Sequence, residues 1–100
     1  MRRAARTDVN QAEIVKCLRA AGCSVQSLAT VGQGCPDLLV GAHGINFLLE
    51  VKNAKQAPSA RKLTPYEELW HRQWRGLVAI VETPEQALAA VGIPLIGDVA

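Results

Sequence analysis

Two carboxylates and one ammonium stand inside the most apolar stretch of the chain. The stretch is GCPDLLVGAHGINFLLEVKN, residues 34–53, and its charged residues are Asp37, Glu50 and Lys52. Two carboxylates held close together repel each other, and they suit a divalent cation because carboxylate oxygens and waters are the ligands that Mg²⁺ prefers. A bound Mg²⁺ can activate a water and stabilise the charge that builds on a phosphodiester. A nearby ammonium can orient or deprotonate that water, or stabilise the phosphate oxygens.

A β-hairpin would bring these three residues to one place. With residues 43 and 44 as the turn, Asp37 lies directly opposite Glu50, and opposed residues share a face with Cβ atoms about 5 Å apart. Lys52 is two residues beyond Glu50 and therefore lies on the same face. The main-chain carbonyl of Val51 could supply a further metal ligand. A longer turn would shift these partners, and a structural ion-pair cluster at the sheet edge is the alternative.

The rest of the sequence must supply the elements that position this hairpin. Apolar periodicity, caps and Gly or Pro breaks predict helices over residues 9–21, 64–76 and 83–92, and strands over residues 25–31, 37–42, 45–52 and 77–81. The polar residues 53–63 between them are typical of a mobile loop. The two hairpin strands are apolar on both faces, so we expect them to be central and covered on each side. The resulting order, α-β-β-β-α-β-α, predicts an α/β fold with a mixed sheet flanked by helices.

Length and composition indicate one globular domain. The chain has 100 residues, of which 49% are hydrophobic and 20% charged, a balance typical of a folded domain. We expect residues 1–7 to form a basic flexible arm and residues 8–100 to form the single domain. No apolar run approaches the roughly 20 residues of a membrane span, and the basic N-terminus lacks the apolar stretch of a secretory signal. The default expectation is a cytoplasmic protein without a membrane partner.

Basic residues gather in two places besides the hairpin. One group lies in the N-terminal arm and includes Arg3 and Arg6; the other follows the last hairpin strand and comprises Lys55, Arg61 and Lys62. Basic clusters can mark a polyanionic partner such as nucleic acid. Ordinary solvated tails and loops are the alternative interpretation of charge runs alone.

An aromatic stripe marks the helix predicted over residues 64–76. Tyr66, Trp70 and Trp74 recur at i, i+4 and i+8, so they share one face of that helix. Packing against the sheet is one interpretation. A protein interface is the second, because aromatic residues are enriched at interface cores, and base stacking is the third.

At this point the residues resemble a known family. Pro36-Asp37 followed by Glu50-Val51-Lys52 is the PD-(D/E)xK signature of restriction-endonuclease-like nucleases. Together with that signature, the segments GCPDLLVGAHG, FLLEVKN, KLTPYEELWHRQW and ETPEQALAAVG resemble the virus-type replication-repair nuclease domain, VRR-NUC, in its small stand-alone form from phages and prophages. The resemblance covers about residues 8–92.

The resemblance implies a restriction-endonuclease-like α-β-β-β-α-β core, extended here by a C-terminal helix. It implies Mg²⁺ or Mn²⁺ dependence and hydrolysis of phosphodiester bonds in DNA. Asp37 and Glu50 would be metal ligands, with the Val51 carbonyl, and Lys52 would be the catalytic lysine. Related nucleases often use an acid on the first helix, for which Glu13 is the candidate here, although a solvated surface residue is the alternative. This chain has Glu67 where the family often has Gln, which puts a polar contact near the site in doubt.

The resemblance also bears on partners. The basic residues Lys55, Arg61, Lys62, Arg3 and Arg6 would contact DNA phosphates. Small stand-alone members resemble dimeric enzymes that cut four-way (Holliday) junctions, in repair or recombination, and symmetric cleavage needs two sites and hence a homodimer. Two rival hypotheses are a non-catalytic nucleic-acid-binding module on the same fold, and a protein-interaction module that uses the face of Tyr66, Trp70 and Trp74.

Overall fold

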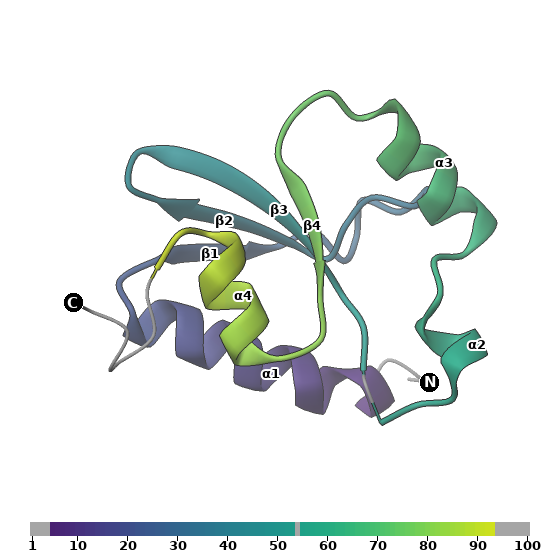
Figure 1. Ribbon diagram of the computed structural model, residues 1–100, viewed down its shortest axis with the longest axis horizontal. Coiled ribbons are helices and arrows are strands. Elements are labelled where there is room, and N and C mark those ends of the chain that lie inside the picture. Colours follow the sequence, from purple (N-terminus) through teal and green to yellow (C-terminus); the bar gives the residue numbers. More distant parts are fainter. Residues whose placement is uncertain (1–4, 54, 94–100) are drawn as a thin grey trace.

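The computed structural model describes residues 5–53 and 55–93, and its elements follow the predicted order with one addition (Figure 1). The elements are α1 (Ala5–Ala20), β1 (Ser24–Ser27), β2 (Leu38–Ala42), β3 (Ile45–Val51), α2 (Pro58–Arg61), α3 (Pro65–Gln73), β4 (Val78–Val81) and α4 (Pro84–Ala90). The addition is α2, a single turn that begins at a proline within the segment predicted to be loop. None of the described helices is long and apolar enough to cross a membrane.

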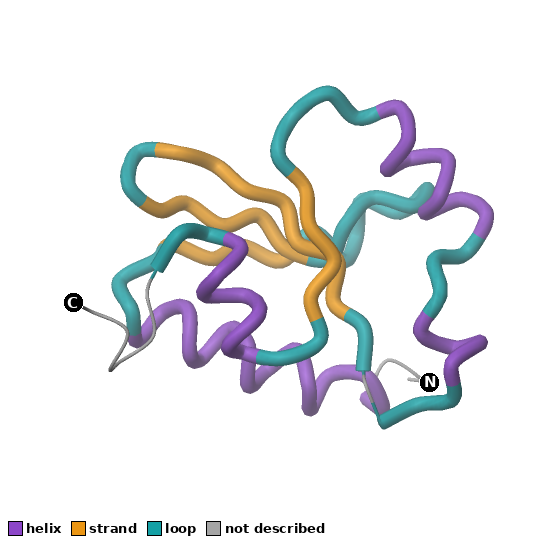
Figure 2. Tube along the Cα trace, in the orientation of Figure 1, coloured by secondary structure: helices purple, strands orange, loops and turns teal. Residues whose placement is uncertain are grey.

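The four strands form one mixed sheet in the order β1-β2-β3-β4 (Figure 2). The first two pairings are antiparallel and β3 pairs with β4 in parallel. The β2–β3 register is the predicted one, with a two-residue turn at His43 and Gly44, whose φ angles of 56° and 76° suit such a turn. The ladder ends at the pair Leu38 and Leu49, one step before Asp37 would pair with Glu50.

Three predicted boundaries were wrong at the ends of elements. α1 begins at Ala5 rather than at residue 9, since Ala and Arg are strong helix formers, so residues 5–7 of the expected arm are helical and residues 1–4 lie outside the described part. β1 ends at Ser27, because the Ser27 hydroxyl accepts the Ala29 N–H (3.2 Å) and starts a turn. α3 ends at Gln73, because the backbone of Trp74 is extended (ψ 131°).

The hydrophobic core lies on one face of the sheet only. α1 and α4 pack side by side against that face (Figure 1), and the largest buried side chains include Ile14, Leu18, Leu38, Val40, Leu49, Val81 and Val91. Alternation places Leu39, Leu48, Val78 and Ile80 on the opposite face, and none of them is buried. The hairpin strands are central in the sheet, as predicted. Their second face is covered only in part, since Leu39, Leu48 and Val78 are half-buried and Ile80 is 48% exposed.

Candidate functional site

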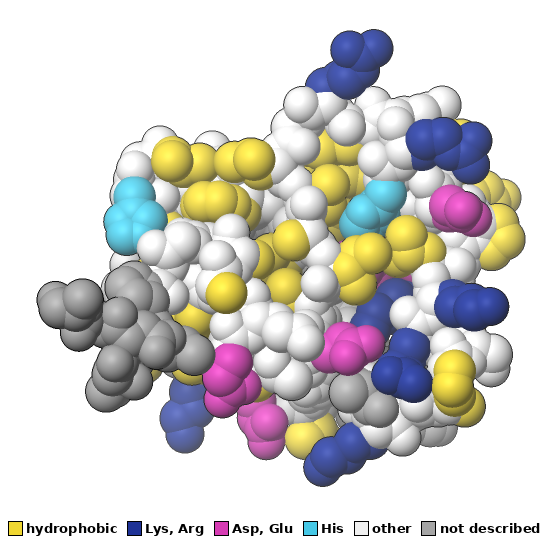
Figure 3. All heavy atoms as spheres, viewed as in Figure 1, with side chains coloured by type: hydrophobic (Ala, Val, Ile, Leu, Met, Phe, Trp, Pro, Cys, Tyr) yellow, Lys and Arg dark blue, Asp and Glu magenta, His cyan; other side chains and the backbone are white. Residues whose placement is uncertain are grey.

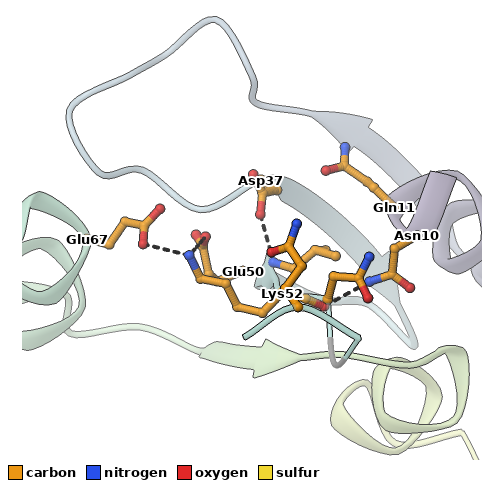
Figure 4. Close-up of a pocket in the computed structure, with 9 residues that line it drawn as sticks. Asn10, Gln11, Asp37, Glu50, Lys52 and Glu67 are labelled. Carbon is orange, nitrogen blue, oxygen red and sulfur yellow. Dashed lines mark hydrogen bonds and ion pairs between the residues drawn. The ribbon is translucent and has the colours of Figure 1, made fainter. Parts of the chain in front are cut away.

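The two strands of the hairpin bring Asp37, Glu50 and Lys52 to one cavity, as the register predicts (Figure 4). Asp37 Oδ2 accepts the main-chain N–H of Val51 at 2.7 Å, which holds its carboxylate against the end of β3. Lys52 Nζ lies 3.6 Å from Glu50 Oε2. The cavity has a volume of about 190 Å³ and is lined by Asn10, Gln11, Asp37, Glu50, Val51, Lys52, Asn53, Gln56 and Glu67.

The carboxylate of Glu67, whose polar contact the resemblance puts in doubt, lies in the cavity. Its Oε1 lies 2.9 Å from Lys52 Nζ. The same oxygen accepts the Thr64 N–H at 2.9 Å, while the Thr64 hydroxyl accepts the Glu67 N–H at 3.2 Å. These two bonds form a capping box at the start of α3. Glu67 therefore completes the cap and contacts the site lysine at the same time (Figure 4).

Amides, and not the predicted acid, reach the cavity from α1. Asn10 Nδ2 donates to the Lys52 carbonyl at 2.8 Å, and Gln11 lines the cavity beside it. Glu13 is exposed and does not line the cavity. It follows Gln11 by two positions, and this separation rotates its side chain by roughly 200° around the helix axis, away from the cavity. Sequence reasoning missed Asn10 and Gln11 because it treated this stretch as the first turn of the helix and looked there only for an acid.

Burial dominates the electrostatics of the two metal-ligand candidates. The side chain of Glu50 is 3% exposed. Its burial, with the nearby charges of Asp37 and Glu67, raises the pKa of Glu50 to about 8. Burial also raises the pKa of Asp37, although the hydrogen bond from the Val51 N–H acts in the opposite direction. In the absence of a cation, this cavity therefore disfavours two ionised carboxylates.

The pKa values of Lys52 and Glu67 shift so that both groups are charged, whereas those of Asp37 and Glu50 shift toward the neutral form. Burial alone would lower the pKa of Lys52, but the hydrogen bond and charge of Glu67 outweigh it, so the pKa lies above its ordinary value. Burial would raise the pKa of Glu67, but the Thr64 N–H and Lys52 bring it below its ordinary value. Lys52 and Glu67 are thus an ammonium and a carboxylate at neutral pH.

The donor set fits a hard divalent cation. Glu50 Oε1 is buried and has no hydrogen-bond partner among the protein atoms that the structure describes, as expected of an oxygen that awaits a ligand. No group of three or more His, Cys, Asp and Glu side chains in residues 5–53 and 55–93 is arranged as a metal cage. Mg²⁺ does not need one, because it binds through one or two carboxylates and keeps several waters.

The basic residues predicted to contact DNA are dispersed around the site. Lys55 and Lys62 are exposed on the segment between β3 and α3. Arg61 is partly buried, and its Nη1 lies 3.9 Å from Glu82 Oε2. Arg3 lies outside the described residues, and Arg6 falls within the backbone of α1. Lys55, Arg61 and Lys62 do not line the cavity.

The aromatic stripe does not pack into the core. No residue of α3 is buried, and the exposed fractions of Tyr66 and Trp74 are 73% and 46%. The rings of Trp70 and Trp74 stack on each other, with centroids 4.5 Å apart. Figure 3 shows hydrophobic side chains at the surface around α3. The core interpretation of this stripe was therefore wrong.

The element order, the mixed sheet and the PD-(D/E)xK residues at the ends of β2 and β3 define a restriction-endonuclease-like fold. Among solved structures, the chain is similar to one described as "VRR_NUC domain", with a TM-score of 0.62 and 26% identity, over 81% of this chain and 88% of that one. No protein-family model matches the chain, and no curated protein matches it significantly. The structural match confirms the resemblance to the VRR-NUC family that the sequence predicts.

Proposed function

We propose that this chain is a metal-dependent DNA endonuclease that hydrolyses phosphodiester bonds. The observation that carries the proposal is the convergence of Asp37, Glu50 and Lys52 on one cavity, in a fold similar to that of a domain from a nuclease family. The same three residues have no evident structural need to meet, because burying charges in a small protein usually costs more than it returns.

Asp37, Glu50 and the Val51 carbonyl would hold Mg²⁺ or Mn²⁺. When bound, the cation supplies a water of lowered pKa and neutralises charge that builds on the scissile phosphate. The hydrogen bond from the Val51 N–H fixes one Asp37 oxygen at 2.7 Å and so orients the carboxylate. Glu50 Oε1, which has no hydrogen-bond partner among the described residues, is available to bind the cation.

Lys52 acts as a fixed positive charge in this proposal. Glu67 holds the ammonium at 2.9 Å and keeps its pKa above the ordinary value, so the side chain is a poor proton acceptor at neutral pH. Its contribution is then to stabilise the phosphate oxygens in the transition state. Of the alternatives open at the level of sequence, this geometry favours charge stabilisation over deprotonation of the water. Glu13 has no part in the proposed site.

The DNA contacts are proposed from charge and proximity. Lys55, Arg61 and Lys62 follow β3 directly and would bind backbone phosphates, which positions DNA without reading its sequence. Arg3 and Arg6 would add to this from the N-terminus. The preferred substrate is proposed to be branched DNA such as a four-way junction, in a phage or bacterial recombination or repair setting.

A homodimer is part of the same proposal. The partly covered sheet face carries Leu39, Leu48 and Val78, which are half-buried, and Ile80, which is 48% exposed. Leu77 and two members of the aromatic stripe, Tyr66 and Trp74, are also exposed. Apolar surface of this kind marks protein interfaces, and a second copy would supply the second active site that symmetric junction cleavage requires. A protein-interaction module without catalysis would use the same face.

A cleavage panel tests the function. Labelled four-way junction, flap, duplex and single-stranded DNA are incubated with the protein in Mg²⁺, Mn²⁺ or EDTA. The proposal expects metal-dependent cutting, with the branched substrates cut fastest. Binding of DNA without cutting in either metal would favour the non-catalytic module, and neither binding nor cutting would favour the protein-interaction module.

A further inference from the structure

A second hollow adjoins the candidate active site along α1. It has a volume of about 690 Å³ and lies between α1 and the turn that follows β1. Its lining residues are Gln11, Ala12, Val15, Lys16, Arg19, Ser27 and Ala29, and we call this the α1 groove. Gln11 lines both the groove and the active-site cavity. The α1 groove therefore lies next to the active-site cavity, with Gln11 on their common border.

The charged side chains that line the α1 groove in the described part of the chain are basic. They are Lys16 and Arg19, and both are exposed. Arg19 Nη2 donates to the Val25 carbonyl at 3.1 Å, which fixes the guanidinium against the edge of the sheet. Its other N–H groups have no partner among the residues that the structure describes, so the guanidinium is oriented in advance for a planar or tetrahedral anion.

The spacing of the groove suits a nucleic-acid strand. Gln11 and Arg19 are eight residues apart on α1, which corresponds to about 12 Å along the helix axis. One strand of B-form DNA advances 3.4 Å along the duplex axis per nucleotide, so about three to four nucleotides cover this length where the duplex axis runs along α1. Val15 and Ala12 form an apolar floor between the polar ends, against which sugar rings can rest.

We propose that the α1 groove holds the sugar–phosphate backbone of the strand being cut, on one side of the scissile bond. Lys16 and Arg19 contact successive phosphates, and Gln11 marks the point where the strand enters the cavity. The inference rests on the proposed nuclease function and adds a strand path to it. The contacts position DNA without reading its bases. Of the basic residues singled out in the sequence, Lys55, Arg61 and Lys62 do not line this groove.

The test measures DNA binding without cleavage, as the salt dependence of affinity in EDTA. Each lost phosphate contact reduces the slope of log K against log salt by about 0.9 for duplex DNA, so Lys16→Ala is expected to lower both the slope and the affinity. Lys16 makes no hydrogen bond or ion pair with the described residues, so this variant should fold normally. Arg19→Lys keeps the charge and is expected to retain most of the slope that Arg19→Ala loses.

Arg72→Ala is the matched control, because Arg72 is an exposed cation on α3 that lines neither cavity. In cleavage assays with Mg²⁺, Lys16→Ala is expected to raise KM several-fold and leave kcat unchanged. If Lys16→Ala and Arg19→Ala both bind as the wild type does, the groove proposal is overturned while the nuclease proposal stands. A wild-type chain that binds no DNA would overturn both.

Discussion

The Lys52 ammonium lies closer to Glu67, at 2.9 Å, than to Glu50, at 3.6 Å. The Glu67 oxygen that it meets also accepts the Thr64 N–H that begins α3. The position of the site lysine is therefore tied to the start of a helix from another part of the chain. The family often has Gln where this chain has Glu67. That difference put a polar contact near the site in doubt, but the Glu67 carboxylate does make one, to Lys52.

Glu67→Gln should separate the charge of this residue from its structural role. Glu and Gln both complete a capping box, so the free energy of unfolding should stay close to that of the wild type. Loss of the negative charge loosens the hold on Lys52, and we expect kcat to fall by roughly tenfold, which is about 1.4 kcal/mol of activation free energy. Single-turnover cleavage and denaturant unfolding measure the two effects.

Thr64→Ala is the control for that variant. It removes the hydroxyl side of the cap and leaves the Glu67–Lys52 contact in place. We expect a loss of about 1 kcal/mol in unfolding free energy and near-normal cleavage at a temperature where the variant is folded. Full activity in Glu67→Gln would show that the carboxylate charge is not needed.

The metal-free protein should lose stability as the pH rises. The pKa of Glu50 is raised from an ordinary 4.5 to about 8, chiefly by burial, so the folded state holds a proton that the unfolded chain releases. Stability from this group is fully present below about pH 4.5 and is lost as pH rises through about 8. Urea midpoints measured in EDTA should therefore fall over this window.

Glu50→Gln should remove most of that pH dependence and should be the more stable protein at pH 8. Comparing the two proteins isolates this carboxyl from Asp37 and His71, whose pKa values are shifted as well. Equal pH profiles for the two proteins would mean that Glu50 titrates normally.

A divalent cation should stabilise the wild type through Asp37. A ligand that binds only the folded state stabilises it by RT ln(1 + [L]/Kd), so the unfolding temperature rises with the logarithm of the ligand concentration. We expect Mn²⁺ to raise Tm by several degrees in the wild type and by much less in Asp37→Asn, which keeps the size of the side chain. Glu68→Gln, a change at an exposed carboxylate on α3 outside the cavity, should respond as the wild type does. A full Mn²⁺ response in Asp37→Asn would exclude this residue as a ligand.

The exposed apolar face should mediate self-association. Ile80→Asp places a charge in the middle of the proposed interface, and we expect it to convert a dimer into a monomer, as measured by light scattering after gel filtration. Val9→Asp is the matched control, since Val9 is 68% exposed on α1, away from that face. A wild-type chain that is monomeric at tens of micromolar would contradict the dimer.

The sequence determined the hairpin because its information is local. The turn at His43 and Gly44 fixes the register, and the register places Glu50 and Lys52 on one face next to Asp37. The sequence could not predict the places of Gln11 and Glu67 in the site, since these depend on how α1 and α3 dock against the sheet. Strand patterns also could not show that one sheet face is covered only in part, because an apolar strand has the same sequence pattern under a helix or under a partner.

The most direct test of the account compares cleavage by the wild type, Lys52→Ala and Arg75→Ala on the best substrate of the panel. Arg75 is exposed and lines neither cavity, so its variant controls for the loss of one positive charge. With Mg²⁺ present, we expect Arg75→Ala to cut normally and Lys52→Ala to be slower by about 10²–10³-fold, as when a single transition-state donor is removed. Metal-dependent cutting that survives unchanged in a folded Lys52→Ala protein would contradict the assignment of this cavity as the active site.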